Sequence, residues 1–158
     1  MSDRIAIINE CIIEQLDTPQ NIYNHPKTTF VADFIGESNI LNGIVSNITD
    51  NITKVDINNI TLEILYNPKD KIDDKINILI RPENIKVSKN KLKDSIKGIV
   101  KDIIYDGAIN KLFIEIDNNI ILKVNTQEDL DLKEETEVYL KIDKNSIVPI
   151  RGKKNEKE

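Results

Sequence analysis

The chain contains 158 residues, of which 39% are hydrophobic and 31% are charged, a composition typical of a folded soluble protein. The net charge of −5 and an aromatic content of only 4% argue against a nucleic-acid-binding surface, which needs clustered cations and stacking rings. No apolar run approaches the ~18 residues that span a bilayer, and no secretory signal is evident. The single cysteine, Cys11, excludes an internal disulfide and fits a reducing, cytoplasmic compartment.

The first elements predicted along the chain are a short hairpin and a helix. The sequence RIAIINECIIEQL (residues 4–16) predicts two strands joined by a tight turn at Asn9-Glu10. Thr18 is a suitable N-cap for a helix, because its hydroxyl can accept a hydrogen bond from a free backbone N–H. Pro19 is pre-set for the first helical position, and Pro26 ends the helix because the residue before a proline avoids helical geometry.

A second helix is predicted in TTFVADFI (residues 28–35). Phe30, Val31 and Phe34 are expected to share one face of this helix because of their spacing. Gly36 is placed to end it.

After this helix the hydrophobic period changes from helical to two, which is typical of half-buried strands. Residues 52–64 predict a hairpin that turns at Asn58-Asn59, since asparagine tolerates the positive φ of a tight turn. Residues 111–124 repeat this pattern with a turn at Asn118-Asn119. The side chains expected to face the core are Val55, Ile57, Ile60, Leu62 and Ile64 in the first hairpin and Leu112, Ile114, Ile116, Ile120, Leu122 and Val124 in the second.

Further short strands bring the expected total to about eight to ten between residues 39 and 150. They lie in residues 75–88, 95–107, 136–143 and 147–150. Many short strands at close spacing predict a mainly β fold, either a small barrel or a sandwich.

Three parts of the chain are distinguished on this basis. Residues 1–38 read as a fragmentary α/β piece, and residues 39–150 as a complete β-domain. Residues 67–75 are expected to be a polar loop, and residues 151–158 a charged tail that is disordered because it has nothing apolar to bury.

Several short motifs occur in order along nearly the whole chain and carry a family resemblance. They are SDRI (residues 2–5), Gln15 with Thr18-Pro19, Ile22-Tyr23 with Pro26, FVA and FIG (residues 30–32 and 34–36) with Asn39, and RPE (residues 81–83). Together they resemble the C-terminal half of the ATP-binding subunits of ABC importers, most of all those of spermidine/putrescine (polyamine) importers. In that family an ATP-binding domain is followed by an OB-like, transport-associated (TOBE) domain.

The resemblance implies a function for this chain as a regulatory and dimerisation domain that performs no catalysis itself. ATP and Mg²⁺ would bind to an upstream ATPase domain, because the five glycines of this chain cannot form a phosphate loop. The implied partners are that ATPase domain, a second copy of the protein and transmembrane permease subunits, at the inner face of the membrane. The family-motif or interface candidates are Asp3, Arg4, Phe34, Gly36, Asn39, Arg81, Pro82 and Glu83.

Alternatives remain at this stage for both substrate and class. The wording FIGESN (residues 34–39) favours polyamine importers over importers of sugar, iron, sulfate or thiamine. A protein of another class with the same fold would be a free-standing oxyanion-binding module. Two departures from the family pattern are Cys11, where a hairpin glycine is usual, and Asp17, where the family has glycine before Thr-Pro.

Several other polar residues could have either a structural role or a functional role. Arg81 to Glu83 are expected to form a rigid turn between strands, with a domain-interface role for Arg81 and Glu83 as the alternative. The acidic stretch at residues 127–137 is expected to be a solvated loop or short helix. Its sharper interpretation is a surface that binds polyamine and slows the transporter, through Glu128, Asp129, Glu134 and Glu135. Neither the lone His25 nor Cys11 has partners that would predict a metal or catalytic site.

Overall fold

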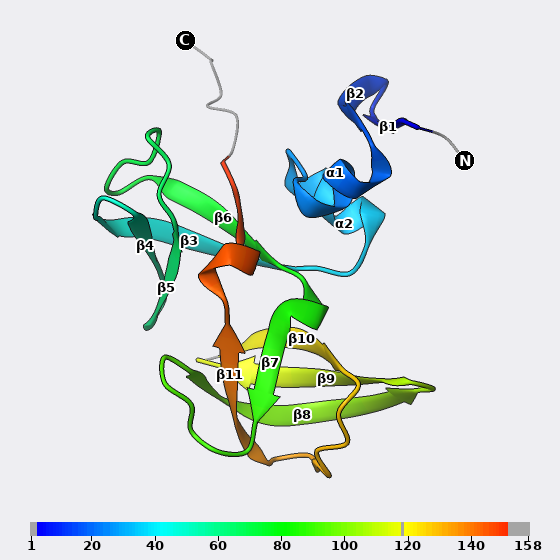
Figure 1. Cartoon of the computed structure of the whole chain (residues 1–158), viewed down its shortest axis with the longest axis vertical. Coiled ribbons are helices and arrows are strands. Elements are labelled where there is room, and N and C mark those ends of the chain that lie inside the picture. Colours follow the sequence, from blue (N-terminus) through cyan, green and yellow to red (C-terminus); the bar gives the residue numbers. More distant parts are fainter. Residues whose placement is uncertain (1–2, 118, 152–158) are drawn as a thin grey trace.

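The computed structural model describes residues 3–117 and 119–151, and it is mainly β, as predicted (Figure 1). The strands are β1 (Ile5–Asn9), β2 (Ile12–Asp17), β3 (Asn39–Ile48), β4 (Ile52–Ile57), β5 (Ile60–Leu65), β6 (Lys75–Ile80), β7 (Ile85–Ser88), β8 (Ile96–Asp106), β9 (Ile109–Ile116), β10 (Ile120–Thr126), β11 (Glu137–Ile142) and β12 (Val148–Ile150). The helices are α1 (Pro19–Asn24) and α2 (Thr29–Ile35), with short 3-10 turns η1 (Pro82–Asn84) and η2 (Lys144–Ser146). Within the described ranges no helix is long and apolar enough to cross a membrane.

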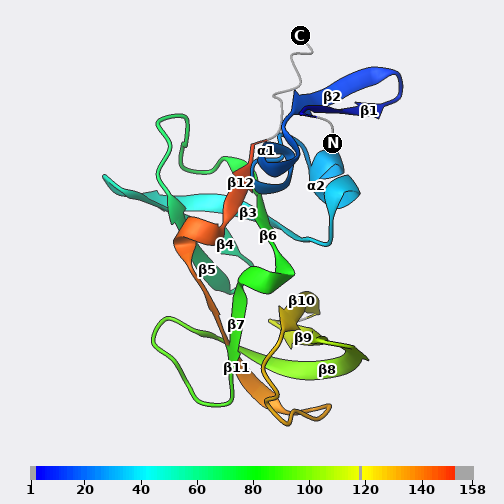
Figure 2. The same cartoon turned by 45° about the vertical axis from the view of Figure 1, so that its right-hand side comes forward.

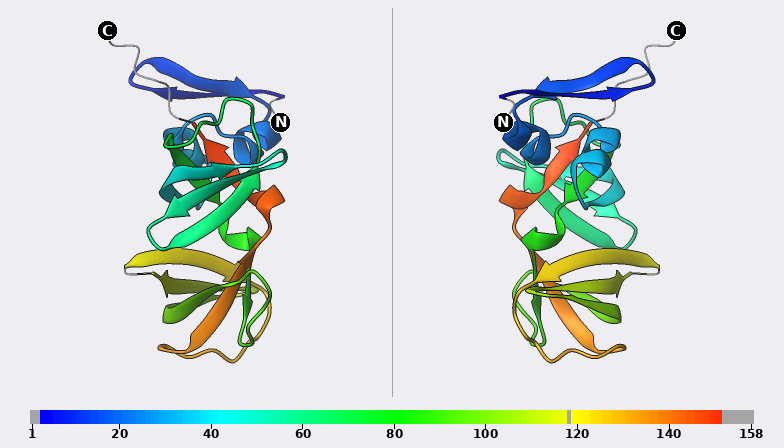
Figure 3. Two further views of the ribbon diagram at one scale, coloured as in Figure 1. Left: turned by 90° about the vertical axis from the view of Figure 1, so that its left-hand side faces the viewer. Right: turned by 90° about the vertical axis from the view of Figure 1, so that its right-hand side faces the viewer.

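The ten strands from β3 to β12 form two sheets that repeat one topology. One sheet has the order β12-β6-β3-β4-β5 and the other β7-β11-β8-β9-β10. The β-domain consists of two halves, β3 to β7 and β8 to β12, and each half has four strands, a 3-10 turn and a final strand. The final strands, β7 and β12, are exchanged between the halves. Strand β7 thus pairs with β11, and β12 pairs with β6. The two sheets lie one above the other in Figure 3.

The repeat is visible in the sequence as Gly-Ile-Val at residues 43–45 and again at residues 98–100. Each glycine lies where the neighbouring strand approaches closely. A Cβ atom on Gly43 would lie 2.3 Å from Val55 Cγ1, and one on Gly98 would lie 2.6 Å from Ile114 Cγ2. Strands β3 and β8 both have a register shift directly after the valine. The two halves therefore bend at equivalent positions.

The predicted alternation of the two central hairpins is confirmed, and it builds one continuous core. Val55 and Ile64 of one sheet and Ile114 and Leu122 of the other are completely buried, and they belong to a single cluster that spans both sheets. The first turn lies at Asn58 and Asn59, as predicted, and Asn58 has φ 52°. In the second hairpin Ile116 pairs with Ile120. The predicted turn residue Asn118 lies outside the described residues.

The N-terminal hairpin forms as predicted, but its turn is at Glu10 and Cys11, one residue later than expected. Both have positive φ, 48° and 63°, a conformation that favours glycine or asparagine. The predicted departure from the family pattern at Cys11 therefore falls at a backbone position where a side chain is unfavourable. The hairpin is joined to the helices by Gln15, whose side chain accepts a hydrogen bond from the Lys27 amide at 2.9 Å.

The two helices lie between this hairpin and the sheet that contains β6. Thr18 caps α1, as predicted, and Thr28 caps α2, each accepting a hydrogen bond from a backbone amide in the first turn. The expected common face of α2 is wrong in one respect. Phe30 and Phe34 stack on its exposed side with ring centroids 6.0 Å apart, whereas Val31 is buried against the hairpin.

The end of the described chain also differs from prediction. Arg151, assigned to the charged tail, donates from Nε to Asp70 Oδ1 at 2.7 Å. Asp70 lies in the loop expected to be merely polar, yet its side chain is only 1% exposed and also accepts from the Thr53 hydroxyl at 2.7 Å. A buried carboxylate needs such partners, so Arg151 fixes the loop to the end of β12. Residues 152–158 lie outside the described residues.

Candidate functional site

The motif residue Arg81 follows β6, and its side chain reaches back to the helical segment. It is only 4% exposed. Its guanidinium donates to the carbonyl oxygens of Tyr23 at 3.0 Å and of Ala32 and Glu37 at 3.1 Å. Two of these carbonyls belong to the last turns of α1 and α2, where backbone oxygens lack helical partners and partial negative charge accumulates. Arg81 therefore satisfies both helix ends at once.

Tyr23 and Glu83 complete this cluster. The guanidinium carbon of Arg81 lies 4.2 Å from the centre of the Tyr23 ring, a cation–π geometry. The Tyr23 hydroxyl donates to a Glu83 carboxylate oxygen. Burial, followed by the nearby Glu83 carboxylate, raises the pKa of Tyr23 to about 12. Pro82 is buried as the first residue of η1, where its missing N–H has no cost.

A second group of contacts joins the start of β3 to the other sheet. The side-chain amide of Asn39 donates to the Lys123 carbonyl and its oxygen accepts from the Lys123 amide, both at 2.8 Å. Asn39 therefore imitates one residue of a neighbouring strand at the free edge of β10. Beside it, Lys111 Nζ lies 3.1 Å from Glu37 Oε1, and this contact lowers the pKa of the Glu37 carboxyl from its usual value.

Gly36 lies between these two groups and is the C-cap of α2, so the helix ends where predicted. Its φ of 177° is extended backbone, so it does not end α2 through a left-handed conformation. A Cβ atom at this position would lie 3.2 Å from Cε2 of Tyr23, closer than ordinary van der Waals contact. The glycine therefore allows Tyr23 to approach the chain beside Arg81.

The remaining family-motif residues lie apart from this cluster. Asp3 and Arg4 are exposed at the start of the described chain, and neither makes a side-chain hydrogen bond or ion pair with another described residue. Phe34 is 65% exposed on α2. The structure therefore brings together five of the eight candidates, namely Gly36, Asn39, Arg81, Pro82 and Glu83.

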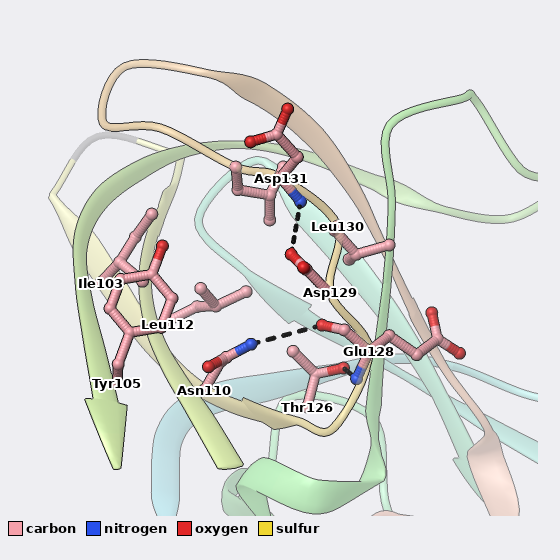
Figure 4. A pocket seen from close by; sticks show the side chains of 10 residues that line it. Ile103, Tyr105, Asn110, Leu112, Thr126, Glu128, Asp129, Leu130 and Asp131 are labelled. Carbon is pink, nitrogen blue, oxygen red and sulfur yellow. Dashed lines mark hydrogen bonds between the residues drawn. The ribbon is translucent and has the colours of Figure 1, made fainter. Parts of the chain in front are cut away.

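The acidic stretch is a loop without helix between β10 and β11, anchored by the buried Leu132. Glu128 and Asp129 lie beside a hollow of only about 10 Å³, shown in Figure 4, with Tyr105 and Asn110 on its other side. This hollow is too small to enclose an organic ligand.

The other half of this acidic stretch is also exposed to solvent. Glu134 lies on the surface, and Glu135 is paired with Lys101 at 3.2 Å. Within residues 3–117 and 119–151 there is no group of three or more His, Cys, Asp or Glu side chains arranged to hold a metal ion.

Comparison with known families identifies the second part of the chain. Residues 78–150 match the family described as the TOBE domain, a match that begins in β6 and includes the Arg81–Glu83 motif. This chain carries a TOBE domain. The TOBE match ends with β12, so it includes both exchanged strands, β7 and β12.

The relatives extend the similarity beyond the TOBE domain. The spermidine/putrescine import ATP-binding protein PotA of Fusobacterium nucleatum is 39% identical over 131 residues, 78% of this chain and 35% of the relative. The proteins of the same name from Borrelia garinii and Thermotoga maritima are 36% and 34% identical, over 90% and 80% of this chain and 39% and 36% of the relatives. The chain thus spans less than two fifths of these relatives, and the family predicted from the sequence motifs is confirmed.

A solved structure confirms the predicted OB-like fold of the TOBE domain. The cytoplasmic molybdate-binding protein ModG, with molybdate bound, superposes with a TM-score of 0.63. The superposition covers 72% of this chain and 96% of that chain at 12% identity, a likeness that concerns the fold alone.

Several residues of the site were not predicted from the sequence. Lys111 and Lys123 carry no motif signal, because a lysine on the outer face of a strand usually faces solvent. Glu37 lies within FIGESN, but its contact with Lys111 was not predicted. Tyr23 belongs to the family pattern, but nothing in its local sequence indicates that it would lie over Arg81, 58 residues away.

Proposed function

We propose that this chain is the C-terminal regulatory and dimerisation part of the ATP-binding subunit of an ABC importer for spermidine and putrescine. The observation that carries the proposal is the extent of the similarity to polyamine import ATP-binding proteins. The alignment with the Borrelia garinii protein includes 90% of this chain, far more than the TOBE domain at residues 78–150. The similarity therefore includes much of the segment that precedes the TOBE domain.

In this proposal the chain performs no chemistry. ATP and Mg²⁺ bind to an ATPase domain that precedes these residues in the full protein, and a second copy of the protein pairs with the first. The pair drives transmembrane permease subunits from the inner face of the membrane. A TOBE domain attached to each ATPase domain can hold the pair together when the catalytic domains separate, and it can respond to ligands that prefer one state.

An unpartnered apolar face supports a covering domain at the N-terminal hairpin. Ile8 and Ile13 are paired across β1 and β2 and are 60% and 58% exposed. Figure 1 shows the hairpin on the outer side of the helices, away from both five-stranded sheets. An isolated two-stranded hairpin is only marginally stable, so an apolar outer face of this kind is suited to packing against another domain.

A titration tests this partner directly. The ATP-binding part of the Fusobacterium nucleatum relative, produced without its aligned C-terminal region, is titrated with this chain in a calorimeter. We expect binding, and a loss of at least about tenfold in affinity when Ile8→Asp and Ile13→Asp are combined. The matched control is Ile72→Asp, because Ile72 is 57% exposed in a loop of the other part of the chain. Equal binding by all three proteins, or none, would contradict the proposal.

The alternatives make different predictions. An importer of sugar, iron, sulfate or thiamine would use the same subunit architecture with another permease, so uptake assays with these substrates distinguish them. A free-standing oxyanion-binding module would bind molybdate, sulfate or phosphate with this chain alone. Titration of the chain with each oxyanion should show no binding if the proposed function is right.

A further inference from the structure

The sheet that contains β8 has an open seam between its two edge strands, β7 and β10. Strands β7 and β10 are the outermost strands of the order β7-β11-β8-β9-β10, and β10 lies against β7 and η1 without pairing with them (Figure 2). A cavity of about 660 Å³ lies in this seam. It is lined by Glu83, Asn84, Ile85, Lys86 and Val87 on one wall and by Ile109, Asn125, Thr126, Gln127 and Glu128 on the other.

One short segment contacts both sides of this seam. We name residues 36–39, which run from the end of α2 to the first residue of β3, the strap. On the β7 side the strap is held by Arg81, which donates to the carbonyls of Gly36 at 3.4 Å and Glu37 at 3.1 Å. Glu83, in the wall itself, is held by the Tyr23 hydroxyl. The helical segment therefore contacts the β7 wall through two neighbouring motif residues.

The same strap is held on the β10 side by different side chains. Glu37 pairs with Lys111 of β9, and Asn39 forms two hydrogen bonds with the backbone of Lys123 in β10. Glu37 thus uses its carbonyl toward one wall and its carboxylate toward the other. Ser38 fixes the strap to α2 by donating to Asp33 at 2.7 Å.

The equivalent place in the other half has no such strap. Counting back from the repeated glycines, Asp94 precedes Gly98 as Asn39 precedes Gly43. No side-chain hydrogen bond connects Asp94 to β5 in the described residues. A groove of about 880 Å³ lies there instead, lined by Asp94, Ser95 and Glu63 among others. The fold therefore does not itself require the strap, which occurs where the helical segment joins the β-domain.

We propose that the strap couples the position of the α1–α2 segment to the width of the seam between β7 and β10. Because the strap and Arg81 share contacts with both helix ends, a displacement of the helices must move or break contacts at both walls. By reciprocity, anything that widens or occupies the seam cavity must shift the helical segment. This coupling goes beyond the proposed function, and it holds whichever substrate the importer carries.

Hydrogen exchange of single amides in the full 158-residue chain tests the coupling. Tyr23→Phe removes only the hydroxyl that contacts Glu83 on the β7 wall. The reporter is the Lys123 amide, which donates to Asn39 on the opposite wall and which Tyr23 does not contact. We expect its exchange to become at least about threefold faster, within the range that loss of one hydrogen bond can produce. In the reverse direction, Glu37→Gln should accelerate the Asn84 amide, which donates to the Arg81 carbonyl at 3.0 Å.

Two controls separate coupling from a general loss of stability. The Val100 amide of β8, bonded to the carbonyl of Thr136 just before β11, should keep its exchange rate in both variants. Lys97→Met, which removes an exposed ion pair with Glu137 at 3.1 Å, should leave the Lys123 amide unchanged. Unchanged exchange at Lys123 in Tyr23→Phe, or equal acceleration at Lys123 and Val100, would overturn the proposal.

Discussion

Arg81 shows how one residue can hold two parts of a chain together. Its charge is buried, and the carbonyls of Tyr23, Ala32, Gly36 and Glu37 compensate for the lost water together with the face of the Tyr23 ring. When the hydrogen bonds to a buried charge are lost, the charge stays buried without compensation, and the folded state is strongly destabilised. The planar guanidinium reaches several acceptors at fixed angles, which an ammonium group cannot do.

We therefore expect Arg81→Lys to lower the free energy of unfolding by about 2–4 kcal/mol, even though the charge is conserved. Urea denaturation measures the change. Lys97→Met is the control, because its ion pair with Glu137 is exposed to solvent and should contribute little to stability. Equal stability of Arg81→Lys and the wild type would show that the carbonyl contacts do not matter.

The pKa of Tyr23 gives a pH dependence with a definite sign. Its folded value of about 12 exceeds the ordinary value of 10.0, so the folded state binds this proton more tightly. The resulting stability is fully present below pH 10 and is lost as the pH rises from 10 to 12. Urea denaturation at a series of pH values should show this loss in the wild type and a smaller one in Tyr23→Phe. Parallel curves for the two proteins would contradict the assignment.

For single residues, the sequence predicted which positions are important, but it did not predict which contacts their side chains make. The motif Arg81-Pro82-Glu83 was recognised, with a rigid turn as its expected role and a domain-interface role for Arg81 and Glu83 as the alternative. A turn does form at η1, but the side chains of Arg81 and Glu83 contact Tyr23, about 60 positions earlier. Local sequence patterns carry no information about such pairs, because their proximity depends on the exchange of strands and the packing of α1.

The N-terminal hairpin gives a test at the level of single elements. Cys11 has φ 63°, a conformation in which a side chain is strained and glycine is not. We expect Cys11→Gly to stabilise the folded hairpin by about 0.5–1 kcal/mol. Amide exchange within β1 and β2 measures this local change. The matched control is Cys11→Ala, which keeps the strain and removes only the thiol, so a gain in both variants would contradict the explanation.

Strands β3 and β8 make a second prediction about elements. A methyl group at Gly43 or Gly98 would meet a neighbouring core side chain at 2.3 or 2.6 Å, so the adjacent strand must move. Gly43→Ala and Gly98→Ala should each lower the free energy of unfolding by about 1–3 kcal/mol, measured in urea. Lys141→Ala, at an exposed strand position, is the control. A neutral effect at both glycines would contradict the close approach.

Strand positions and their buried faces were predictable, because a period of two specifies which side chains face the core. The pairing of the strands was not. That β7 joins β11 and β12 joins β6 depends on contacts between halves of the chain, which short-range patterns do not describe. The repeat of Gly-Ile-Val was present in the sequence, but a three-residue repeat is too short to indicate a duplicated sheet without the structure.

For the molecule as a whole, the acidic loop remains a predicted polyamine surface. Glu134 and Glu135 are exposed, so millimolar spermidine should raise the melting temperature in low salt if it binds there. Charge reversal of both residues to lysine should abolish this shift. Reversal of Glu10 and Glu63, also exposed, should preserve it. The absence of any shift in the wild type would end this hypothesis.

The central claim is that this chain works as part of an importer's ATP-binding subunit. The most direct measurement is spermidine uptake by a chimera of the Fusobacterium nucleatum relative in which the aligned C-terminal region is replaced by this chain. The chimera is reconstituted in vesicles with the permease subunits of that relative. The account predicts ATP-dependent uptake at a rate comparable with that of the unaltered relative. A chimera that folds and binds ATP, yet gives no more uptake than the relative lacking its C-terminal region, would contradict it.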